Sequence, residues 1–138
     1  MNEQEIVEAR NELVGGWLVK AERDLASMRL LGEASYFDTA LYHAQQAAEK
    51  AVKGLLLFHG QEFEKTHDIE KLVRLGTPFV AELAFQLPKA ELLTPYAMRF
   101  RYPGEFLEPD GEEFSKAEQA ATDFYNFILS QLPKEVHP

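Results

Sequence analysis

The segment Tyr42–Lys53, YHAQQAAEKAVK, places the strongest constraint on the fold of this chain. At about 100° per residue, its alanines join nearby leucine and valine side chains in an apolar surface covering more than half of a helix. A helix with so little polar surface lies inside a bundle rather than at its edge. The sequence therefore predicts a central helix that Ser35 caps and that ends near His59 at Gly60.

A narrow polar arc remains on this central helix, and it contains two cations, an imidazole, an amide and a carboxylate. Such a set can hold an anionic ligand, or it can be an ordinary solvated face supported by a Glu–Lys pair at i,i+4 spacing. Gln45 falls on the apolar side instead, so its amide either has a buried partner or faces another subunit. The arc consists of His43, Gln46, Glu49, Lys50 and Lys53.

The length and composition favour one globular domain. The chain has 138 residues, 46% of them hydrophobic, which is enough for a single sizeable core. The absence of cysteine excludes disulfides, thiolate metal sites and a cysteine nucleophile. The acidic start MNEQEIVEAR is unlike a secretory signal, and the longest aliphatic or aromatic run, Leu55–Phe58, is far too short to cross a membrane. We therefore expect a cytoplasmic protein that does not enter the membrane.

The net charge of −9 limits how the chain can contact nucleic acid. An acidic protein repels phosphate at long range, so any RNA or nucleotide contact requires a local cationic patch. One acidic segment is interpreted as a loop and a helix start, where carboxylates favour the positive end of the helix dipole. The alternative is a docking surface for a basic partner. The segment contains Glu105, Glu108, Asp110, Glu112, Glu113 and Glu118.

Helical patterns and helix-ending residues recur along the whole chain, and no alternating strand pattern is present. With mostly short connections, they predict an all-α, up-and-down antiparallel bundle of about five helices. The expected segments are 2–13 ended by Gly15-Gly16, 17–31 ended by Gly32, the central helix, a helix capped by Thr66, a turn starting at Thr77-Pro78, a helix from Pro88 to Pro103 kinked at Pro95, and 112–132.

The histidines give little support for a metal site. Glu64-x-x-His67 has the spacing used by metal sites in helical bundles, but those sites need a second such pair and additional glutamates. His67 is expected instead to order the start of the third helix. The sequence therefore predicts no metal ligands and no cofactor.

A second cationic cluster lies in the segment Tyr96–Pro103. Its two arginines, Arg99 and Arg101, can each bind phosphate or carboxylate in a fork, and the Tyr102 ring can stack on a base. The alternative is structural, with one arginine closing a buried ion pair with Glu49 or Asp38. Both interpretations remain open at this point.

Four motifs in order resemble the HEPN family, the higher-eukaryote and prokaryote nucleotide-binding domains. They are Trp17-x-x-x-Ala21-Glu-x-Asp24-Leu, HAQQAAEKAVKGLL, Lys65-Thr-His67-Asp68-Ile-x-x-Leu72 and Arg99-Phe-Arg101-Tyr102-Pro103. The resemblance covers nearly the whole chain and implies a HEPN-like helical domain at residues 16–132, with an N-terminal extension at 1–15 and a C-terminal tail at 133–138. It also implies a homodimer.

The resemblance further implies one of two activities. Many bacterial members partner a small nucleotidyltransferase, often in toxin–antitoxin pairs, and others are metal-independent ribonucleases with a histidine four to six residues after an arginine. No histidine lies at 102–107 here, so the expected acid–base group is missing, unless His43 or His67 approaches Arg101 in the fold. No catalytic residue is therefore assigned.

The favoured hypothesis is a non-catalytic subunit that holds a nucleotide or RNA for a nucleotidyltransferase partner. The alternatives are an endoribonuclease toxin and a purely structural homodimer or adaptor. The predicted nucleotide-binding residues are His43, Gln46, Lys50, Lys53, Arg99, Arg101 and Tyr102.

Overall fold

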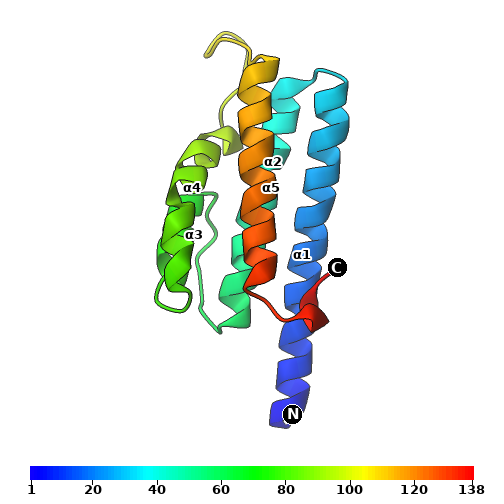
Figure 1. Ribbon diagram of the computed structural model, residues 1–138, viewed down its shortest axis with the longest axis vertical. Helices are drawn as coiled ribbons and strands as arrows, with labels where there is room; N and C mark the ends of the chain where they lie inside the picture. Colours follow the sequence, from blue (N-terminus) through cyan, green and yellow to red (C-terminus); the bar gives the residue numbers. More distant parts are fainter.

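The computed structural model describes the whole chain, Met1–Pro138, and confirms the all-α bundle (Figure 1). It contains five α-helices and three short 3₁₀-helices, with no strand. The α-helices are α1 (Glu3–Glu33), α2 (Phe37–Phe58), α3 (Ile69–Gly76), α4 (Leu87–Leu93) and α5 (Gly111–Ser130). The 3₁₀-helices are η1 (Ala81–Gln86), η2 (Thr94–Ala97) and η3 (Lys134–Val136).

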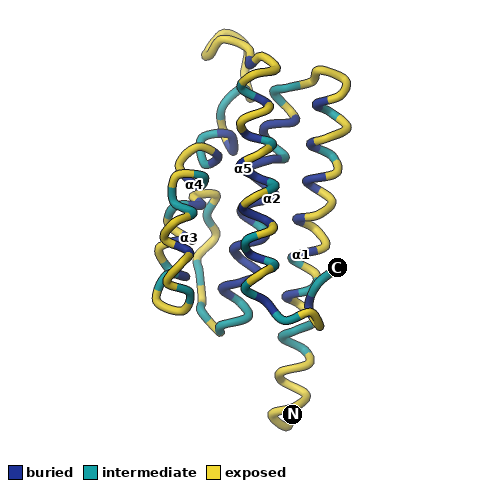
Figure 2. The backbone as a smooth tube through the Cα atoms, in the orientation of Figure 1, coloured by how far each residue is buried: buried dark blue, intermediate teal, exposed yellow.

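Helix α2 is the centre of the bundle, as its composition predicts. Helices α1, α3 and α5 all pack against it, and Figure 2 shows dark, buried segments along its length. Its alanines let neighbouring helices approach closely, and so does Gly54, where an added Cβ would lie 3.4 Å from Trp17 Cβ on α1. Because the alanines and most other apolar residues of α2 are buried within one chain, its apolar surface is not evidence for a subunit interface.

The predicted break at Gly15-Gly16 is wrong, because α1 continues through both glycines. Two glycines inside a helix cost about 1 kcal/mol each relative to alanine. Val14 and Leu18 flank the pair and are fully buried, so continuing the helix keeps both in the core. The first turns of α1 extend beyond the bundle as an exposed overhang (Figures 1 and 2).

Ser35 does not cap α2, contrary to the sequence prediction. It has a φ of 64° and ends α1 instead. Its N–H donates to Gly32 O at 3.0 Å and the Tyr36 N–H donates to Leu31 O at 2.9 Å, which is the Schellman arrangement. Gly60, with a φ of 69°, ends α2 in the same way, as predicted.

The segment between α2 and α5 forms shorter helices than expected, whereas α5 lies close to its predicted range of 112–132. Asp68, rather than Thr66, caps α3 by accepting from the Lys71 N–H at 3.2 Å. The predicted interruption near Pro95 is present, since α4 ends at Leu93 and a 3₁₀ turn follows. The segment after this turn, with both arginines, forms bends and turns that lie against the start of α2. The final 3₁₀ turn packs on α1, and its Val136 is buried.

Candidate functional site

The polar arc of α2 separates into two hydrogen-bonded networks. The first, called here the Asp24 network, joins α2 to α1. His43 Nδ1 lies 2.8 Å from Asp24 Oδ1, and Lys50 Nζ donates to Asp24 Oδ2 at 2.6 Å. An ionised carboxylate only accepts hydrogen bonds, so Nδ1 carries the proton in this contact. Nε2 of His43 is then the nitrogen available to a ligand.

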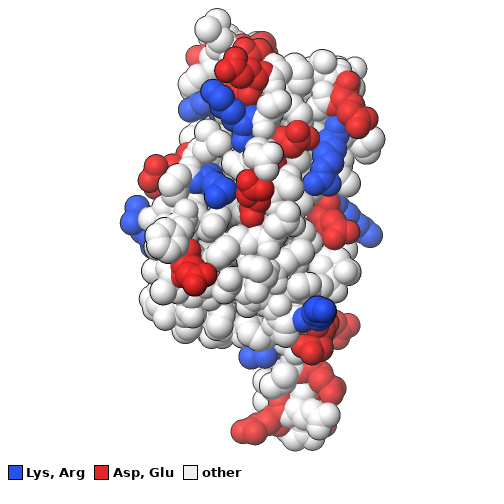
Figure 3. Space-filling model, in the orientation of Figure 1, with Lys and Arg blue, Asp and Glu red and all other residues white.

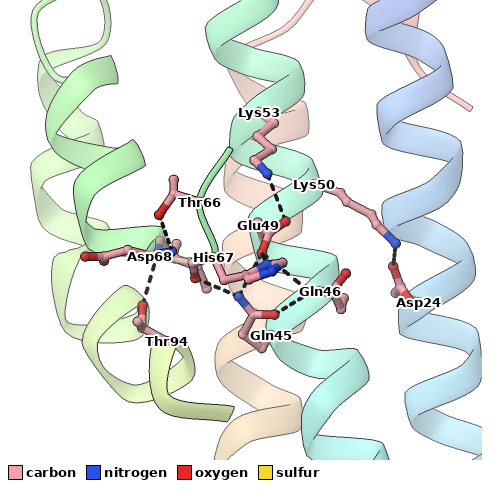
Figure 4. Close-up of polar contacts among 11 residues, drawn as sticks. Asp24, Gln45, Gln46, Glu49, Lys50, Lys53, Thr66, His67, Asp68 and Thr94 are labelled. Atoms are coloured by element: carbon pink, nitrogen blue, oxygen red, sulfur yellow. Dashed lines mark hydrogen bonds and ion pairs between the residues drawn. The ribbon is translucent and has the colours of Figure 1, made fainter. Parts of the chain in front are cut away.

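The second group, called here the Glu49 network, joins α2 to the segment before α3 (Figure 4). His67 Nδ1 lies 2.7 Å from Glu49 Oε1, and Lys53 Nζ donates to Glu49 Oε2 at 3.0 Å. Gln45 Nε2 donates to Glu49 Oε1 at 3.1 Å and to His67 O at 2.9 Å. Gln46 completes the network by donating to Gln45 Oε1 at 2.7 Å. Gln45 therefore has a buried partner and faces no other subunit.

Burial and hydrogen bonding act in opposite directions on Glu49. Burial favours the neutral acid, but hydrogen bonds from Gln45, His67 and Lys53, together with the Lys53 charge, outweigh it and lower the pKa of Glu49 below 4.5. The carboxylate is thus charged at neutral pH and binds the loop that leads into α3. Nζ of its partner Lys53 also lies near the rings of Trp17 and Phe63, at 5.8 and 5.7 Å from their centroids.

The polar arc is therefore not a solvated face. Gln46, Glu49 and Lys53 are buried, and their hydrogen-bonding groups are directed at one another. Figure 4 shows Lys53 and Lys50 pointing to different carboxylates, Glu49 on the same helix and Asp24 on α1. The structure thus divides the four predicted residues of α2 between the two networks.

Of these four residues, His43 lies beside the arginine cluster. A surface pocket of about 310 Å³, called here the arginine pocket, lies between the first turns of α2 and the segment after η2. His43, Arg99 and Arg101 contribute its ionisable nitrogens. Lys50 reaches this pocket only indirectly, through the carboxylate that it shares with His43. The pocket is lined by Asp38, Thr39, Tyr42, His43, Arg99, Phe100 and Arg101.

The two arginines are placed by an unusual backbone turn. Phe100, between them, has a φ of 68°, in the left-handed region that a bulky residue rarely adopts. Its half-buried ring stacks on Tyr96 at 6.2 Å between centroids and meets Phe106 edge-on at 6.1 Å. These contacts hold a conformation that costs about 1–3 kcal/mol. The turn lets Arg99 and Arg101 line one pocket although they flank Phe100.

The structural alternative for the arginines is wrong. Neither Arg99 nor Arg101 forms a salt bridge, and Glu49 is paired with Lys53 and His67 instead. The Arg99 guanidinium lies over Tyr96 and Phe106, 5.6 and 5.1 Å from the ring centroids. Stacking leaves its N–H groups free to contact an anion.

Asp24 was not among the predicted site residues, although the sequence carries a signal for it. Asp24 lies in the apolar row that includes Ala21, Leu25 and Met28, and it is 7% exposed. A carboxylate at a core position of a helix requires a partner, and His43 and Lys50 supply two. Tyr102 was predicted at the site but does not line the arginine pocket. It lines a neighbouring pocket, which also includes Arg99.

Comparison with known proteins agrees with this architecture. The HEPN domain family model matches residues 14–132. The chain belongs to the HEPN domain family. A protein of Methanocaldococcus jannaschii named "Putative toxin MJ1304" is 30% identical over 125 residues, which covers 81% of each chain.

Two crystal structures resemble this HEPN chain over most of its length. ST0689, described as an archaeal HEPN homologue, has a TM-score of 0.70 and 31% identity, covering 86% of this chain and 96% of its own. TT1696 from Thermus thermophilus has a TM-score of 0.77 and 26% identity, covering 88% and 99%. In this HEPN chain no helix combines the length and apolar character needed to span a membrane.

Proposed function

We propose that this HEPN protein binds the phosphate of a nucleotide or an RNA chain in the arginine pocket, as the toxin-type subunit that partners a small nucleotidyltransferase. The observation that carries the proposal is the pocket wall, in which His43 of α2 meets Arg99 and Arg101. These three side chains are far apart in the sequence but line one concavity, and arginine binds phosphate well. Neither arginine forms a salt bridge with a carboxylate of this chain.

The electrostatics favour a small, defined ligand over a long nucleic acid. With a net charge of −9, the surface repels a polyanion except near the pocket. In Figure 3 acidic side chains gather at the end of the bundle where α5 begins, with basic side chains beside them. Asp38 also lines the pocket, so the arginines have to supply the attraction. A single nucleotide or a short single-stranded segment fits this arrangement.

A direct binding measurement tests the proposal. The wild-type protein is expected to bind a nucleoside 5′-monophosphate and a short oligoribonucleotide in calorimetry, more tightly at low salt. Arg99→Gln/Arg101→Gln is expected to lose most of this affinity. Arg74→Gln is the control for loss of a cation outside the pocket, because Arg74 is exposed on α3 and contacts Glu70. Equal affinities for both variants would reject the arginine pocket as the binding site.

The partner is tested separately. A nucleotidyltransferase encoded beside this protein is expected to copurify with it when the two are produced together, and to relieve any growth inhibition that this chain causes. The name of the Methanocaldococcus relative supports the toxin role.

The expected homodimer is part of the proposal, but the apolar surface of α2 does not form its interface. Exposed apolar side chains on α1, such as Leu13 at 61%, offer a surface for it.

A second function, metal-independent RNA cleavage, is favoured by the location of His43. Histidine is missing after Arg101 in the sequence, but His43 lines the same pocket from another helix, oriented by Asp24. In this reaction a ribose 2′-oxygen attacks the adjacent phosphorus, His43 takes its proton, and the bond to the 5′-oxygen breaks as that oxygen is protonated by water. The arginines would stabilise the charge that develops on the phosphate oxygens.

Cleavage of a short RNA in the presence of a chelator tests this second function. His43→Gln is expected to abolish cleavage, and Asp24→Asn to reduce it. His67→Gln serves as the control because His67 belongs to the Glu49 network. Binding without cleavage, in contaminant-free protein, would leave only the binding function.

A further inference from the structure

A second concavity adjoins the arginine pocket and differs from it in chemistry. Its volume is about 430 Å³, and its wall carries mostly apolar and aromatic groups. It is called here the Tyr102 pocket. Met98, Tyr102 and Phe106 are 61%, 66% and 49% exposed, so large apolar side chains face solvent together. The wall comprises Pro95, Met98, Arg99, Tyr102, Glu105 and Phe106.

Arg99 connects the two pockets, since its side chain lines both. In the Tyr102 pocket its guanidinium plane lies near the Phe106 ring, and in the arginine pocket it stands beside Arg101. A nucleotide joins a flat base to a charged phosphate through one sugar. Adjoining pockets for stacking and for phosphate therefore match the two ends of a single nucleotide.

We propose that the Tyr102 pocket holds the base of the nucleotide whose phosphate occupies the arginine pocket, and that Glu105 selects guanine. The inference rests on the proposed phosphate-binding function. Tyr102 and Phe106 supply the stacking surface, since aromatic rings accept any base on their faces. An apolar peptide side chain would use these rings but would gain nothing from the arginines next to them.

Glu105 gives the base preference. It is the one carboxylate in the Tyr102 pocket, and it forms no salt bridge. A carboxylate accepts hydrogen bonds only. Guanine presents two adjacent donors, N1–H and the 2-amino group, which match the two oxygens of a carboxylate. Uracil presents one N–H between two carbonyl oxygens, which a carboxylate repels. The expected order of affinity is guanine first and uracil last.

Binding of three ligands at low salt tests the inference: GMP, UMP and ribose 5-phosphate, which has the sugar and phosphate but no base. GMP is expected to bind about 10-fold or more tightly than ribose 5-phosphate, because stacking on aromatic side chains has effects of this size. Tyr102→Ala is expected to bring GMP affinity close to that of ribose 5-phosphate, while Tyr102→Phe keeps it. Glu105→Gln is expected to reduce the ratio of GMP to UMP affinity.

Phe85→Ala is the control, since Phe85 is 78% exposed and lies in η1 outside both pockets. The substituted side chains of Tyr102 and Glu105 are exposed, and circular dichroism checks that the variants fold. If all three ligands bind with equal affinity, and substitution of Arg101 weakens that binding, the base pocket is overturned and phosphate binding remains supported. Failure of every ligand to bind would overturn both proposals together.

Discussion

Lys53 Nζ and Glu49 Oε2 lie 3.0 Å apart inside the bundle, where their side chains are only 9% and 5% exposed. Removing one partner of a buried ion pair destabilises the fold, because the remaining charge loses its countercharge. Lys53→Met is expected to lower the free energy of unfolding by about 3 kcal/mol, as measured by urea denaturation. The change also removes the contacts of the ammonium with Trp17 and Phe63.

The control for this prediction is Lys116→Met. Lys116 has the same i,i+4 relationship to Glu112, but both side chains are well exposed, so the effect is expected to stay within about 0.5 kcal/mol. Similar losses in the two variants would show that burial does not distinguish the pairs. Neither substitution is expected to change nucleotide affinity, because Lys53 and Lys116 line neither proposed pocket.

The lowered pKa of Glu49 predicts how stability depends on pH. Glu49 titrates below 4.5 in the folded chain and at about 4.5 when unfolded. Its contribution is therefore fully present above pH 4.5 and is lost as the pH falls through the folded-state pKa, because the unfolded chain takes up the proton first. In Glu49→Gln, the stability measured by chemical denaturation between about pH 3 and 6 is expected to fall less steeply toward acid. A slope identical to wild type would contradict this role for Glu49.

Two helical glycines are expected to respond in opposite ways to alanine. Gly16 is exposed, and no atom lies within 4 Å of an added Cβ, so Gly16→Ala is expected to stabilise the protein by about 0.5–1 kcal/mol. Gly32 contacts Phe114, and an added Cβ would lie 2.2 Å from the ring. Gly32→Ala is therefore expected to destabilise it, by about 1–3 kcal/mol for overpacking. Thermal unfolding of the two variants measures whether each change raises or lowers stability. Stabilisation by Gly32→Ala would contradict the close packing of α1 on α5.

The bundle and its central helix could be predicted from the sequence because the alanine-rich surface of residues 42–53 has only one arrangement that buries it. The ends of helices were harder, because tertiary packing overrides local signals. Burial of Val14 and Leu18 carries α1 through two glycines that usually end a helix. Local pattern also placed Ser35 on the wrong side of the turn between α1 and α2, since serine is a common N-cap but seldom adopts a positive φ.

The candidate site could be predicted only as a set of residue types. A Glu–Lys pair four residues apart has the same pattern on a surface and in a core, so the burial of Lys53 was not visible in the sequence. The approach of His43 to Arg101 depends on how the segment after η2 lies against α2, which is a long-range contact. Asp24 was the one overlooked residue with a local signal, a carboxylate within an apolar row.

The two non-glycine residues with positive φ, Ser35 and Phe100, give the last prediction. Glycine adopts this conformation without steric cost, so Ser35→Gly is expected to stabilise the protein by about 1 kcal/mol and to leave nucleotide affinity unchanged. Phe100→Gly removes the same strain but also the ring that packs on Tyr96 and Phe106, so the arginine-bearing turn loses its support. Because the two arginines are then less well preorganised, the affinity of this variant for a nucleoside 5′-monophosphate is expected to fall by about 10-fold, which corresponds to about 1.4 kcal/mol. Calorimetry on both variants checks this contrast, and wild-type affinity in Phe100→Gly would show that the strained turn does not position Arg99 and Arg101 for binding.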